Sequence, residues 1–357
     1  MVTMLPDVPP FALPPAALRL RLDAEALAHN WRALDRWSGA ARAGAAVKAD
    51  AYGLGVAQAV PVLAEAGCRD WFVAHWSEVS DVLRHVPAHG IAVLHGPMND
   101  ADVAFALETG VRPVLNSLQQ VRRWLAAGGG VCDVMVDTGM NRLGLSAEDL
   151  GDPALQALDI ECCLSHLASA DEDVPQNAQQ LARFSAARTT VRARRYSLAN
   201  SAGIMLGAEY HADLTRPGLS LYGGIARPEM RGAIRQVAQP EAAVIQVRDL
   251  QPGDRVGYNA TFVADRPMRA GVLALGYADG YLRCWSGKGR FAFRGVAVPV
   301  LGRVSMDMTI VDLGAVPDCA EGDWLAVKYD LPEAAEISGL SQYELLTLLG
   351  NRFYRRN

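Results

Sequence analysis

The organisation of the chain is clearest from one stretch, residues 43–55, which reads AGAAVKADAYGLG. Its apolar residues 43–47 end at Lys48, and Tyr52, Gly53 and Gly55 follow closely. This pattern predicts a buried strand that ends in a loop. A lysine at the end of such a strand has its stem in apolar surroundings, and burial lowers the pKa of the amine. A neutral amine can form a Schiff base with an aldehyde, although a lysine that reaches water is the commoner alternative.

The composition is that of a soluble globular protein with two domains. The chain has 357 residues, of which 50% are hydrophobic and 20% charged, and this length exceeds what one core usually supports. The net charge of -5 comes from interspersed charges without a basic stripe, so we expect no nucleic acid partner. No apolar run is long enough to span a membrane. Residues 1–17 are rich in proline and lack a secretory signal pattern, which predicts an N-terminal arm.

The cysteines and histidines predict neither disulfides nor a metal site. The chain has six cysteines, Cys68, Cys132, Cys162, Cys163, Cys284 and Cys319. No pair has the spacing of a redox or zinc motif, and most lie in apolar contexts typical of buried thiols. This usage fits a reducing cytoplasm. His85 and His89 are four residues apart, but no further ligand joins them, whereas a metal site needs three or four.

The first two thirds of the chain alternate between apolar strand patterns and amphipathic helix patterns. The strand candidates are residues 43–47, 71–74, 91–94, 112–115, 131–136, 160–164, 196–199 and 212–214. The clearest helix candidates are residues 24–37, 56–66, 117–127 and 177–194. Eight such units predict a (β/α)8 TIM-like barrel with a parallel sheet. A doubly wound open sheet is the alternative, but no Gly-x-Gly-x-x-Gly lies between a strand and a helix.

The pattern changes at Gln239 and Pro240, where a second domain begins. Short strands separated by Gly, Pro and Asp are expected at residues 244–247, 269–275, 290–294, 296–301 and 309–312. An amphipathic helix at residues 341–349 ends the pattern. We therefore expect an arm at 1–17, an α/β barrel at 18–238 and a mainly β domain at 239–357.

Polar residues gather after several of the predicted barrel strands. In such a barrel, active residues project from the carboxyl ends of the strands. Those ends carry Lys48 and Tyr52 and the segments 137–144, 165–172, 200–203 and 216–219. Phosphate sites often use the loops after strands seven and eight, where Ser201 offers a hydroxyl and Gly218 and Leu219 offer backbone N–H groups. The alternative is that Asn200 and Ser201 cap a helix.

The stretch around Lys48 resembles the pyridoxal phosphate lysine motif of alanine racemases. The likeness continues in collinear order through residues 137–144, 166–172, 200–203, 216–223, 256–261, 276–280, 302–307 and 343–352. It covers nearly the whole chain, and the ordered set is more specific than any single motif. The resemblance implies a fold-type III pyridoxal phosphate enzyme in which Lys48 binds the cofactor covalently.

The resemblance also implies which residues hold pyridoxal phosphate. The matching positions are Lys48, Tyr52, Arg142, His166, Asn200, Ser201, Arg216, Gly218, Leu219 and Tyr343. Within this set, Arg216 matches the arginine bonded to the pyridine nitrogen. A guanidinium can only donate hydrogen bonds, so it would keep this nitrogen unprotonated and weaken the ring as an electron sink. A weaker sink suits a proton exchange without transamination. The alternative for Arg216 is a salt bridge, with Asp213 as a candidate partner.

Racemisation removes the α-proton from one face of the amino acid and returns a proton to the other, which calls for two acid–base groups. Lys48 is one, and the resemblance places the second at Tyr258. A free tyrosine has a pKa of ~10, so it needs a supporting environment, for which His166 and Arg216 are candidates. A packed strand aromatic is the alternative for Tyr258.

The resemblance further implies a homodimer with shared sites. In the family, the equivalents of Tyr258 and Met306 enter the site of the partner subunit, and Arg142 and Met306 lie near the substrate. Residues that match the access corridor are Asp171, Tyr277, Arg283 and Arg303. A narrow corridor would favour a small substrate such as alanine.

Two positions depart from the family pattern. Many members carry a carbamylated lysine that orients the arginine equivalent to Arg142, but this chain has Met135 there. Arg142 must then be held by an anion or by another side chain. The tail after Arg352 also differs from the usual Arg-Val-Pro-Arg.

The expected activity is interconversion of L- and D-alanine with Lys48 and Tyr258 on opposite faces, which supplies D-alanine for peptidoglycan or degrades it. The alternatives are a racemase of another amino acid such as serine, and a pyridoxal phosphate-binding protein without turnover. A decarboxylase of related architecture is a further alternative, but its cysteine-bearing motif is not apparent.

Overall fold

The computed structural model describes residues 14–356, which divide into two compact units. The barrel unit comprises Arg21–Gln239 and Lys328–Leu349. The β unit comprises the segment that ends at Leu20, together with Pro240–Val327 and Gly350–Arg356. Most of the predicted arm at 1–17 lies outside the described residues.

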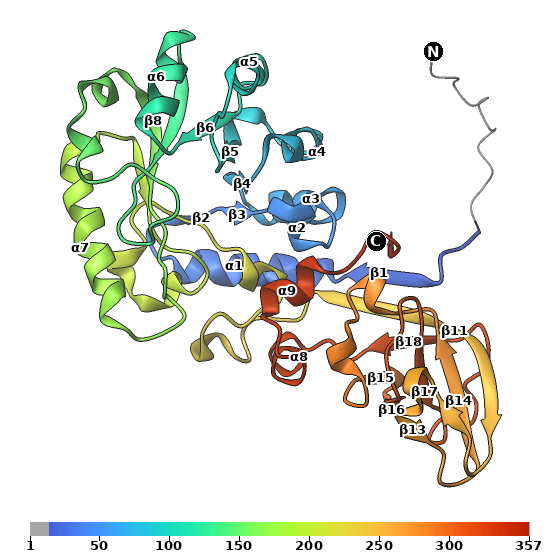
Figure 1. Ribbon diagram of the computed structural model, residues 1–357. Coiled ribbons are helices and arrows are strands. Elements are labelled where there is room, and N and C mark those ends of the chain that lie inside the picture. Colours follow the sequence, from blue (N-terminus) through green and yellow to red (C-terminus); the bar gives the residue numbers. More distant parts are fainter. Residues whose placement is uncertain (1–13, 357) are drawn as a thin grey trace, which may run out of the picture. The chain divides into compact units, whose positions relative to one another are not determined.

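Parallel strands form the centre of the barrel unit (Figure 1). Seven of them pair in the order β3-β4-β5-β6-β7-β8-β9, and β10 pairs in parallel with β2. The strands are β2 (Arg42–Ala43), β3 (Ala45–Ala46), β4 (Trp71–Val73), β5 (Ile91–Val93), β6 (Arg112–Leu115), β7 (Val131–Met135), β8 (Asp159–Leu164), β9 (Arg195–Ser197) and β10 (Leu214–Thr215). Each predicted barrel strand overlaps one of these. The first predicted strand is divided at Gly44, whose N–H donates to Thr215 O at 2.9 Å.

Backbone hydrogen bonds continue the curled sheet past β9. Asp213 N donates to Tyr196 O at 3.0 Å, and Arg216 N donates to Ala199 O at 2.8 Å. These bonds join the β9 segment to the β10 segment, which in turn pairs with β2. The expected α/β barrel is therefore confirmed.

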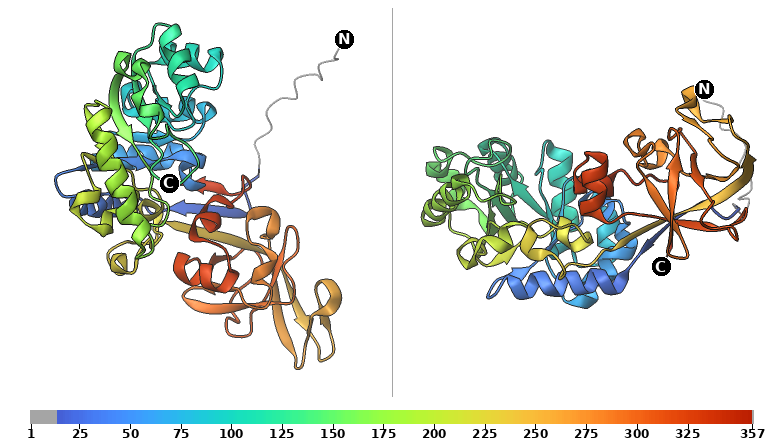
Figure 2. Two further views of the ribbon diagram at one scale, coloured as in Figure 1. Left: turned by 60° about the vertical axis from the view of Figure 1, so that its left-hand side comes forward. Right: turned by 90° about the horizontal axis from the view of Figure 1, so that it is seen from below.

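Helices cover the outer face of the parallel strands, as Figure 2 shows from two further directions. They are α1 (Ala24–Trp37), α3 (Val56–Ala66), α4 (Val79–Leu83), α5 (Asp100–Thr109), α6 (Leu118–Ala126) and α7 (Pro175–Thr190). The short α2 (Lys48–Tyr52) instead follows the end of β3 directly. The side chains of Asp23, Asn99 and Ser117 cap α1, α5 and α6 by accepting backbone N–H bonds. The predictions for α1 and α3 have the observed bounds, while α7 begins and ends earlier than predicted.

The amino ends of the barrel strands are joined by buried and partly buried ion pairs. Arg195 binds Asp70 through two hydrogen bonds of 2.7 and 2.9 Å. Arg112 Nε lies 3.2 Å from both carboxylate oxygens of Asp133, which is fully buried. Breaking such a buried pair leaves an uncompensated charge, so this end of the barrel is built for stability. The cavity described below lies at the other end.

The β unit is an antiparallel sheet in the order β14-β17-β16-β15-β18-β11-β1-β19, and β11 also pairs with β14. The strands are β1 (Leu18–Leu22), β11 (Ala238–Leu250), β14 (Met268–Leu273), β15 (Arg290–Phe293), β16 (Val296–Leu301), β17 (Thr309–Asp312), β18 (Trp324–Val327) and β19 (Tyr354–Arg356). A separate hairpin pairs β12 (Arg255–Val256) with β13 (Phe262–Val263). The expected mainly β domain is confirmed, and its predicted strands all overlap observed ones.

The segment Lys328–Leu349 groups with the barrel unit, although it follows β18 in the chain. It contains α8 (Leu331–Ser338), which was not predicted, and α9 (Gln342–Thr347), which was. The side-chain amide of Gln342 makes two hydrogen bonds to the backbone of Ile225. Its Oε1 accepts from Ile225 N at 2.8 Å, and its Nε2 donates to Ile225 O at 3.0 Å. A Cβ on Gly53 would lie 2.5 Å from Leu346 O, so α9 packs directly on the turn after Lys48.

Candidate active site

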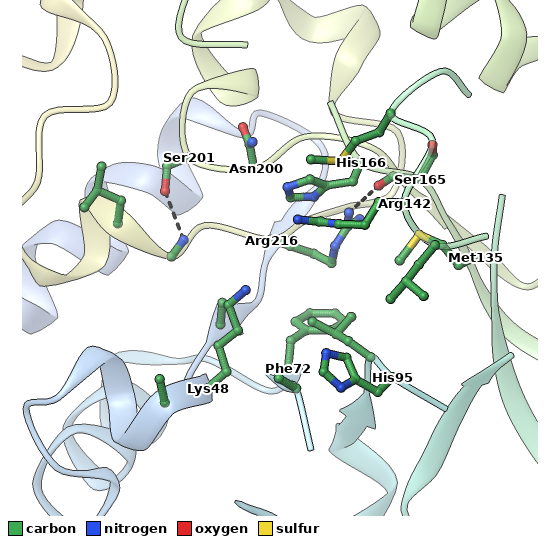
Figure 3. A pocket seen from close by; sticks show the side chains of 18 of the residues that line it. Lys48, Phe72, His95, Met135, Arg142, Ser165, His166, Asn200, Ser201 and Arg216 are labelled. Atoms are coloured by element: carbon green, nitrogen blue, oxygen red, sulfur yellow. Dashed lines mark hydrogen bonds between the residues drawn. The ribbon is translucent and has the colours of Figure 1, made fainter. Parts of the chain in front are cut away.

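A cavity of about 650 Å³ opens at the carboxyl ends of the barrel strands (Figure 3). Its lining includes all ten residues predicted to hold the cofactor, which are Lys48, Tyr52, Arg142, His166, Asn200, Ser201, Arg216, Gly218, Leu219 and Tyr343. They come from five strand ends and from α9. All of them belong to the barrel unit.

Lys48 lies where β3 ends and projects into this cavity (Figure 3). The preceding residue, Val47, donates its N–H to Phe72 O of the next strand at 2.9 Å. Burial lowers the pKa of the Lys48 amine, the positive charge of Arg142 lowers it further, and Glu78 opposes both. A lysine with a lowered pKa is more often neutral, which is the form that attacks a carbonyl.

The turn after Lys48 is wound in the left-handed sense. Residues 49–52 have φ values from 52° to 57°, a conformation that costs about 1–2 kcal/mol for each residue with a Cβ. Backbone hydrogen bonds donated to two carboxylates hold this turn. Glu78 Oε1 accepts from Ala49 N at 2.5 Å, and Asp50 Oδ1 accepts from Val56 N at 2.7 Å. The turn places the Lys48 and Tyr52 side chains in one cavity.

The loops after β9 and β10 meet at Ser201. Its Oγ accepts from Gly218 N at 2.9 Å and from Ser220 N at 3.3 Å. Ser201 therefore joins two loops and does not cap the turn that follows it in the chain. Asn200 does bond that turn, because its Oδ1 accepts from Gly203 N at 2.9 Å. Gly218 lacks a side chain, and a Cβ there would lie 2.2 Å from Tyr52 Oη. A hydroxyl, a phenol and backbone N–H groups thus converge at one end of the cavity.

Aromatic packing fixes Tyr52 at this end. Its ring stacks on that of Tyr222 with the ring centroids 4.8 Å apart. The ring centroid of Tyr343, in α9, lies 6.3 Å from that of Tyr52. Tyr222 Oη donates to Ala46 O at 2.9 Å, which joins the stack to β3. Burial raises the pKa of Tyr52, so its phenol stays protonated and can donate a hydrogen bond.

Arg216 lies buried in the floor of the cavity and is held by neutral groups. Nη1 donates to Ser197 Oγ and Nη2 donates to Ser165 O. Asp213, the alternative partner considered above, instead accepts from Tyr196 N at 2.9 Å. Burial lowers the pKa of Arg216 to about 10, so the guanidinium remains charged at neutral pH.

His166 and Arg142 lie on the side of the cavity next to Arg216 (Figure 3). Burial and the charges of Arg216, Arg142 and Lys48 lower the pKa of His166 to about 3. The imidazole is therefore neutral at neutral pH. Arg142 follows a loop that Asp137 shapes, because its Oδ1 accepts from the N–H groups of Gly139, Met140 and Asn141 at 2.9 to 3.2 Å.

The cavity also contains residues for which we had predicted no role. Phe72 lies within β4, His95 follows β5, and Ser165 follows β8. Met135, the residue at the departure from the family pattern, lines the cavity and is buried. The rule that active residues follow barrel strands could have identified His95, since it comes directly after the predicted strand at 91–94.

The remaining predicted residues lie outside this cavity. Tyr258 and Met306 belong to the β unit and are 65% and 53% exposed in the single chain. Tyr277 N donates to Ser305 O at 3.0 Å, which sets the loops of Tyr277 and Met306 side by side. The Arg283 guanidinium lies 5.1 Å from the centre of the Tyr277 ring. Arg303 and, in the barrel unit, Asp171 are exposed, and the roles of all these residues remain predictions.

Other classes of site find no support in the part of the chain that the structure describes. Residues 14–356 contain no cluster of three or more His, Cys, Asp or Glu side chains arranged for a metal ion. The six cysteines are free thiols, and all but Cys284 are buried. No helix within these residues is both long and apolar enough to cross a membrane.

Two family models match the chain in succession. The model of the alanine racemase N-terminal domain matches residues 22–226, and that of the alanine racemase C-terminal domain matches residues 237–357. The chain belongs to the alanine racemase family. It is an amino-acid racemase by that membership, and the predicted resemblance is confirmed.

Individual relatives agree with this assignment over nearly the whole chain. An alanine racemase of Rhizobium meliloti is 41% identical over 366 residues, covering 95% of this chain and 96% of its own. A biosynthetic alanine racemase of Agrobacterium fabrum is 40% identical, covering 98% and 96%. The solved alanine racemase of Bartonella henselae, which carries covalently bound pyridoxal phosphate, is 33% identical with a TM-score of 0.86 and coverage of 95% and 99%.

Proposed function

We propose that this chain interconverts L-alanine and D-alanine with pyridoxal 5'-phosphate as cofactor. The observation that carries the proposal is that one cavity is lined by Lys48, by the hydrogen-bonded pair Ser201 and Gly218, and by Arg216. These groups correspond to the three parts of the cofactor, namely its aldehyde, its phosphate and its ring nitrogen.

The residues present fit pyridoxal phosphate. Ser201 Oγ accepts from the N–H of Gly218, and the absence of a Cβ at Gly218 lets Tyr52 Oη lie directly against its backbone. Hydroxyls and backbone N–H groups are suitable donors for a phosphate. At the other end, Ser197 and Ser165 each accept one hydrogen bond from the Arg216 guanidinium. A guanidinium has five N–H donors, so Arg216 can still donate to a ring nitrogen.

Each residue then has a distinct role in holding the cofactor. Lys48 would bind the aldehyde carbon, and Tyr52, Ser201, Gly218, Leu219 and Tyr343 would surround the phosphate. Arg142 would donate to the phenolic oxygen, and neutral His166 would face the ring without adding charge. When bound, the cofactor withdraws electrons from the α-carbon of the amino acid and so acidifies its α-proton.

Two groups of the protein would move that proton. Lys48, with its lowered pKa, would take or return the proton on one face of the α-carbon. Tyr258 is our candidate for the opposite face. Its exposure in the single chain leaves the phenol accessible to a second subunit, where it would act as the second acid–base group.

We infer that the enzyme is a homodimer in which the β unit of one chain completes the cavity of the other. Two methionines of this unit, Met306 at 53% and Met308 at 43% exposure, accompany Tyr258 as exposed apolar side chains. Such side chains, when grouped, mark interaction surfaces. In this arrangement Met306 would lie near the substrate, and Tyr277, Arg283, Arg303 and Asp171 would line a corridor narrow enough to favour alanine.

The cellular role follows from the product. We propose that the enzyme supplies D-alanine for peptidoglycan or degrades D-alanine. We also propose that the enzyme is cytoplasmic, because its thiols are free and mostly buried.

A substrate comparison tests the proposed function. The purified protein, loaded with pyridoxal phosphate, should racemise alanine faster than serine, lysine or arginine at equal concentrations, as measured by chiral chromatography of the products. A rate for alanine below that for the other three amino acids would contradict the proposal. The same measurement without added cofactor, after dialysis against an aldehyde-trapping reagent, should show no racemisation.

A further inference from the structure

Gln180 lies on the inward face of α7 and has no exposed surface. Its carboxamide makes three hydrogen bonds to two loops at the carboxyl end of the barrel. Oε1 accepts from Ala168 N at 2.9 Å, and Nε2 donates to His166 O at 2.9 Å and to Thr138 Oγ1 at 3.2 Å. One buried side chain therefore joins the loop after β7, which carries Arg142, to the loop after β8, which carries His166.

The hydrogen bonds continue from Gln180 to the floor of the cavity. Thr138 Oγ1 lies 2.8 Å from Ser165 Oγ, and both residues are buried. Ser165 O in turn accepts from Arg216 Nη2. The path from Gln180 to Arg216 thus runs through two hydroxyls and one carbonyl, all of them in the barrel unit.

We infer that Gln180 is a positioning residue for racemisation, because its carboxamide fixes the His166 loop and the Arg216 guanidinium relative to each other. The inference rests on the proposed function. Gln180 does not line the cavity and therefore acts only through His166 and the Thr138–Ser165 pair.

The chemistry of the carboxamide explains why glutamine occupies this position. Its carbonyl accepts one hydrogen bond while its N–H groups donate two. A buried polar group that is left without its partner destabilises the fold by about 1–3 kcal/mol. A leucine of similar volume would leave Ala168 N and His166 O without a partner. The loop would then relax away from Arg216, and the burial and charge that keep His166 neutral would weaken.

A second amide on α7 holds the same loop independently. Asn177 Nδ2 donates to Ser169 O at 3.1 Å and to Glu172 O at 2.8 Å. These bonds hold the far part of the loop when Gln180 is replaced, so we expect the variant to fold. The local effect on His166 can then be separated from a general loss of structure.

The test compares Gln180→Leu with the matched control Gln179→Leu in the holoenzyme. Gln179 is the preceding residue of the same helix and is exposed. The readouts are kcat and KM for alanine and the pKa of His166, measured by NMR on histidine-labelled protein. The His166 signal is assigned by its disappearance in His166→Asn.

For Gln180→Leu we expect kcat to fall about ten- to a hundredfold, as misplacement of site groups typically causes, while KM changes by less than about threefold. The pKa of His166 should rise by about one unit or more, and Gln179→Leu should match the wild type in all three readouts. A folded Gln180→Leu enzyme with unchanged kcat and unchanged His166 pKa would overturn the inference.

Thr138→Val provides a second test should Gln180→Leu not fold. It removes the hydroxyl that links Gln180 to Ser165 and leaves the bonds of Gln180 to the His166 loop intact. For Thr138→Val we expect kcat to fall about threefold to tenfold. Where Gln180→Leu folds, the double variant should lose no more activity than Gln180→Leu alone, because the two side chains act through one path. An unchanged kcat for Thr138→Val, or fully additive losses, would overturn the path to Arg216. If the wild type proves not to racemise alanine, the proposed function fails. The pKa of His166 in Gln180→Leu still tests whether Gln180 positions the His166 loop.

Discussion

Gly218 donates its backbone N–H to Ser201 Oγ at 2.9 Å, and this bond joins the loops that follow β10 and β9. The same hydroxyl accepts from Ser220 at 3.3 Å. The side of Gly218 without a Cβ faces the phenol of Tyr52. Three strand ends therefore contribute to one donor-lined end of the cavity, where we place the phosphate of the cofactor.

Gly218→Ala should weaken cofactor binding. The new Cβ would lie 2.2 Å from Tyr52 Oη, so Tyr52 must shift away from the phosphate. We expect the dissociation constant for pyridoxal phosphate to rise about tenfold or more, which corresponds to the loss of one charge-assisted hydrogen bond. Equilibrium dialysis of the cofactor measures this. Gly151→Ala, where a Cβ meets nothing within 4 Å, is the matched control, and equal affinities in both variants would refute our placement of the phosphate.

Lys48→Ala should abolish both the covalent attachment of the cofactor and the racemisation. Removal of the amine takes away the group that binds the aldehyde and one of the two bases, so we expect activity to fall about a thousandfold or more. The visible absorbance of the protein-bound cofactor reports the attachment. Lys288→Ala, at an exposed lysine of the β unit, should retain colour and activity. Persistent colour in Lys48→Ala would show that another residue binds the cofactor.

The neutral state of His166 should make stability fall in acid. Its pKa is about 3 in the folded chain, against 6.5 for an ordinary histidine. Between these values the unfolded chain binds more protons at this site, so the free energy of unfolding decreases as the pH falls from 6.5 towards 3. At pH 4.5 this titration lowers the free energy of unfolding by about 2–3 kcal/mol relative to pH 7.

His166→Asn removes this titration. The difference in unfolding free energy between pH 7 and pH 4.5, measured with urea at constant protein concentration, should be about 2–3 kcal/mol smaller in the variant. An identical pH dependence in the wild type and the variant would mean that His166 titrates normally in the folded protein.

Tyr258→Phe should affect the two directions of proton transfer unequally. It removes the base proposed for one face and leaves Lys48 on the other. We expect a loss of about a hundredfold or more in turnover and unequal uptake of solvent deuterium from L- and D-alanine. Tyr354→Phe is a suitable control, because Tyr354 is also exposed in the β unit, at 59%. Equal losses of deuterium uptake from both enantiomers would count against the two-base scheme.

Dilution should inactivate the enzyme if each site needs two chains. Specific activity should fall with protein concentration in parallel with the dimer fraction measured by analytical ultracentrifugation. Constant specific activity in a sample shown to be monomeric would mean that the cavity of the barrel unit is sufficient by itself.

Much of the fold could be predicted because its elements carry local signals. Asp23 and Ser117 mark helix starts as capping residues, and the apolar runs of β4 and β5 are buried throughout. The left-handed turn at residues 49–52 has no such signal, since alanine, aspartate and tyrosine all disfavour it. A hydrogen bond that Ala49 N donates to Glu78, 29 positions further along the chain, holds Ala49 there. The assignment of α9 to the barrel unit likewise depends on a distant contact, that of Gln342 with Ile225.

The residues of the site likewise divide into those that the sequence could identify and those that only the structure reveals. Lys48 and Ser201 could be found because each follows a recognisable strand, and Arg216 gained its meaning from the ordered set of motifs. Gln180 could not be found, since it lies within an ordinary amphipathic helix pattern, and only the structure shows that its side chain reaches His166 and Thr138. Met135 was noticed as a departure, and the structure places it in the wall of the cavity.

The most direct test of the central claim is the fate of L-alanine in heavy water with the purified, pyridoxal phosphate-loaded protein. Chiral chromatography coupled to mass spectrometry follows the enantiomer and the α-hydrogen together. We predict D-alanine carrying one α-deuterium as the first product, then equal amounts of both enantiomers, and no pyruvate. L-Alanine that stays unchanged, or that loses its amino group instead of its configuration, would contradict the account.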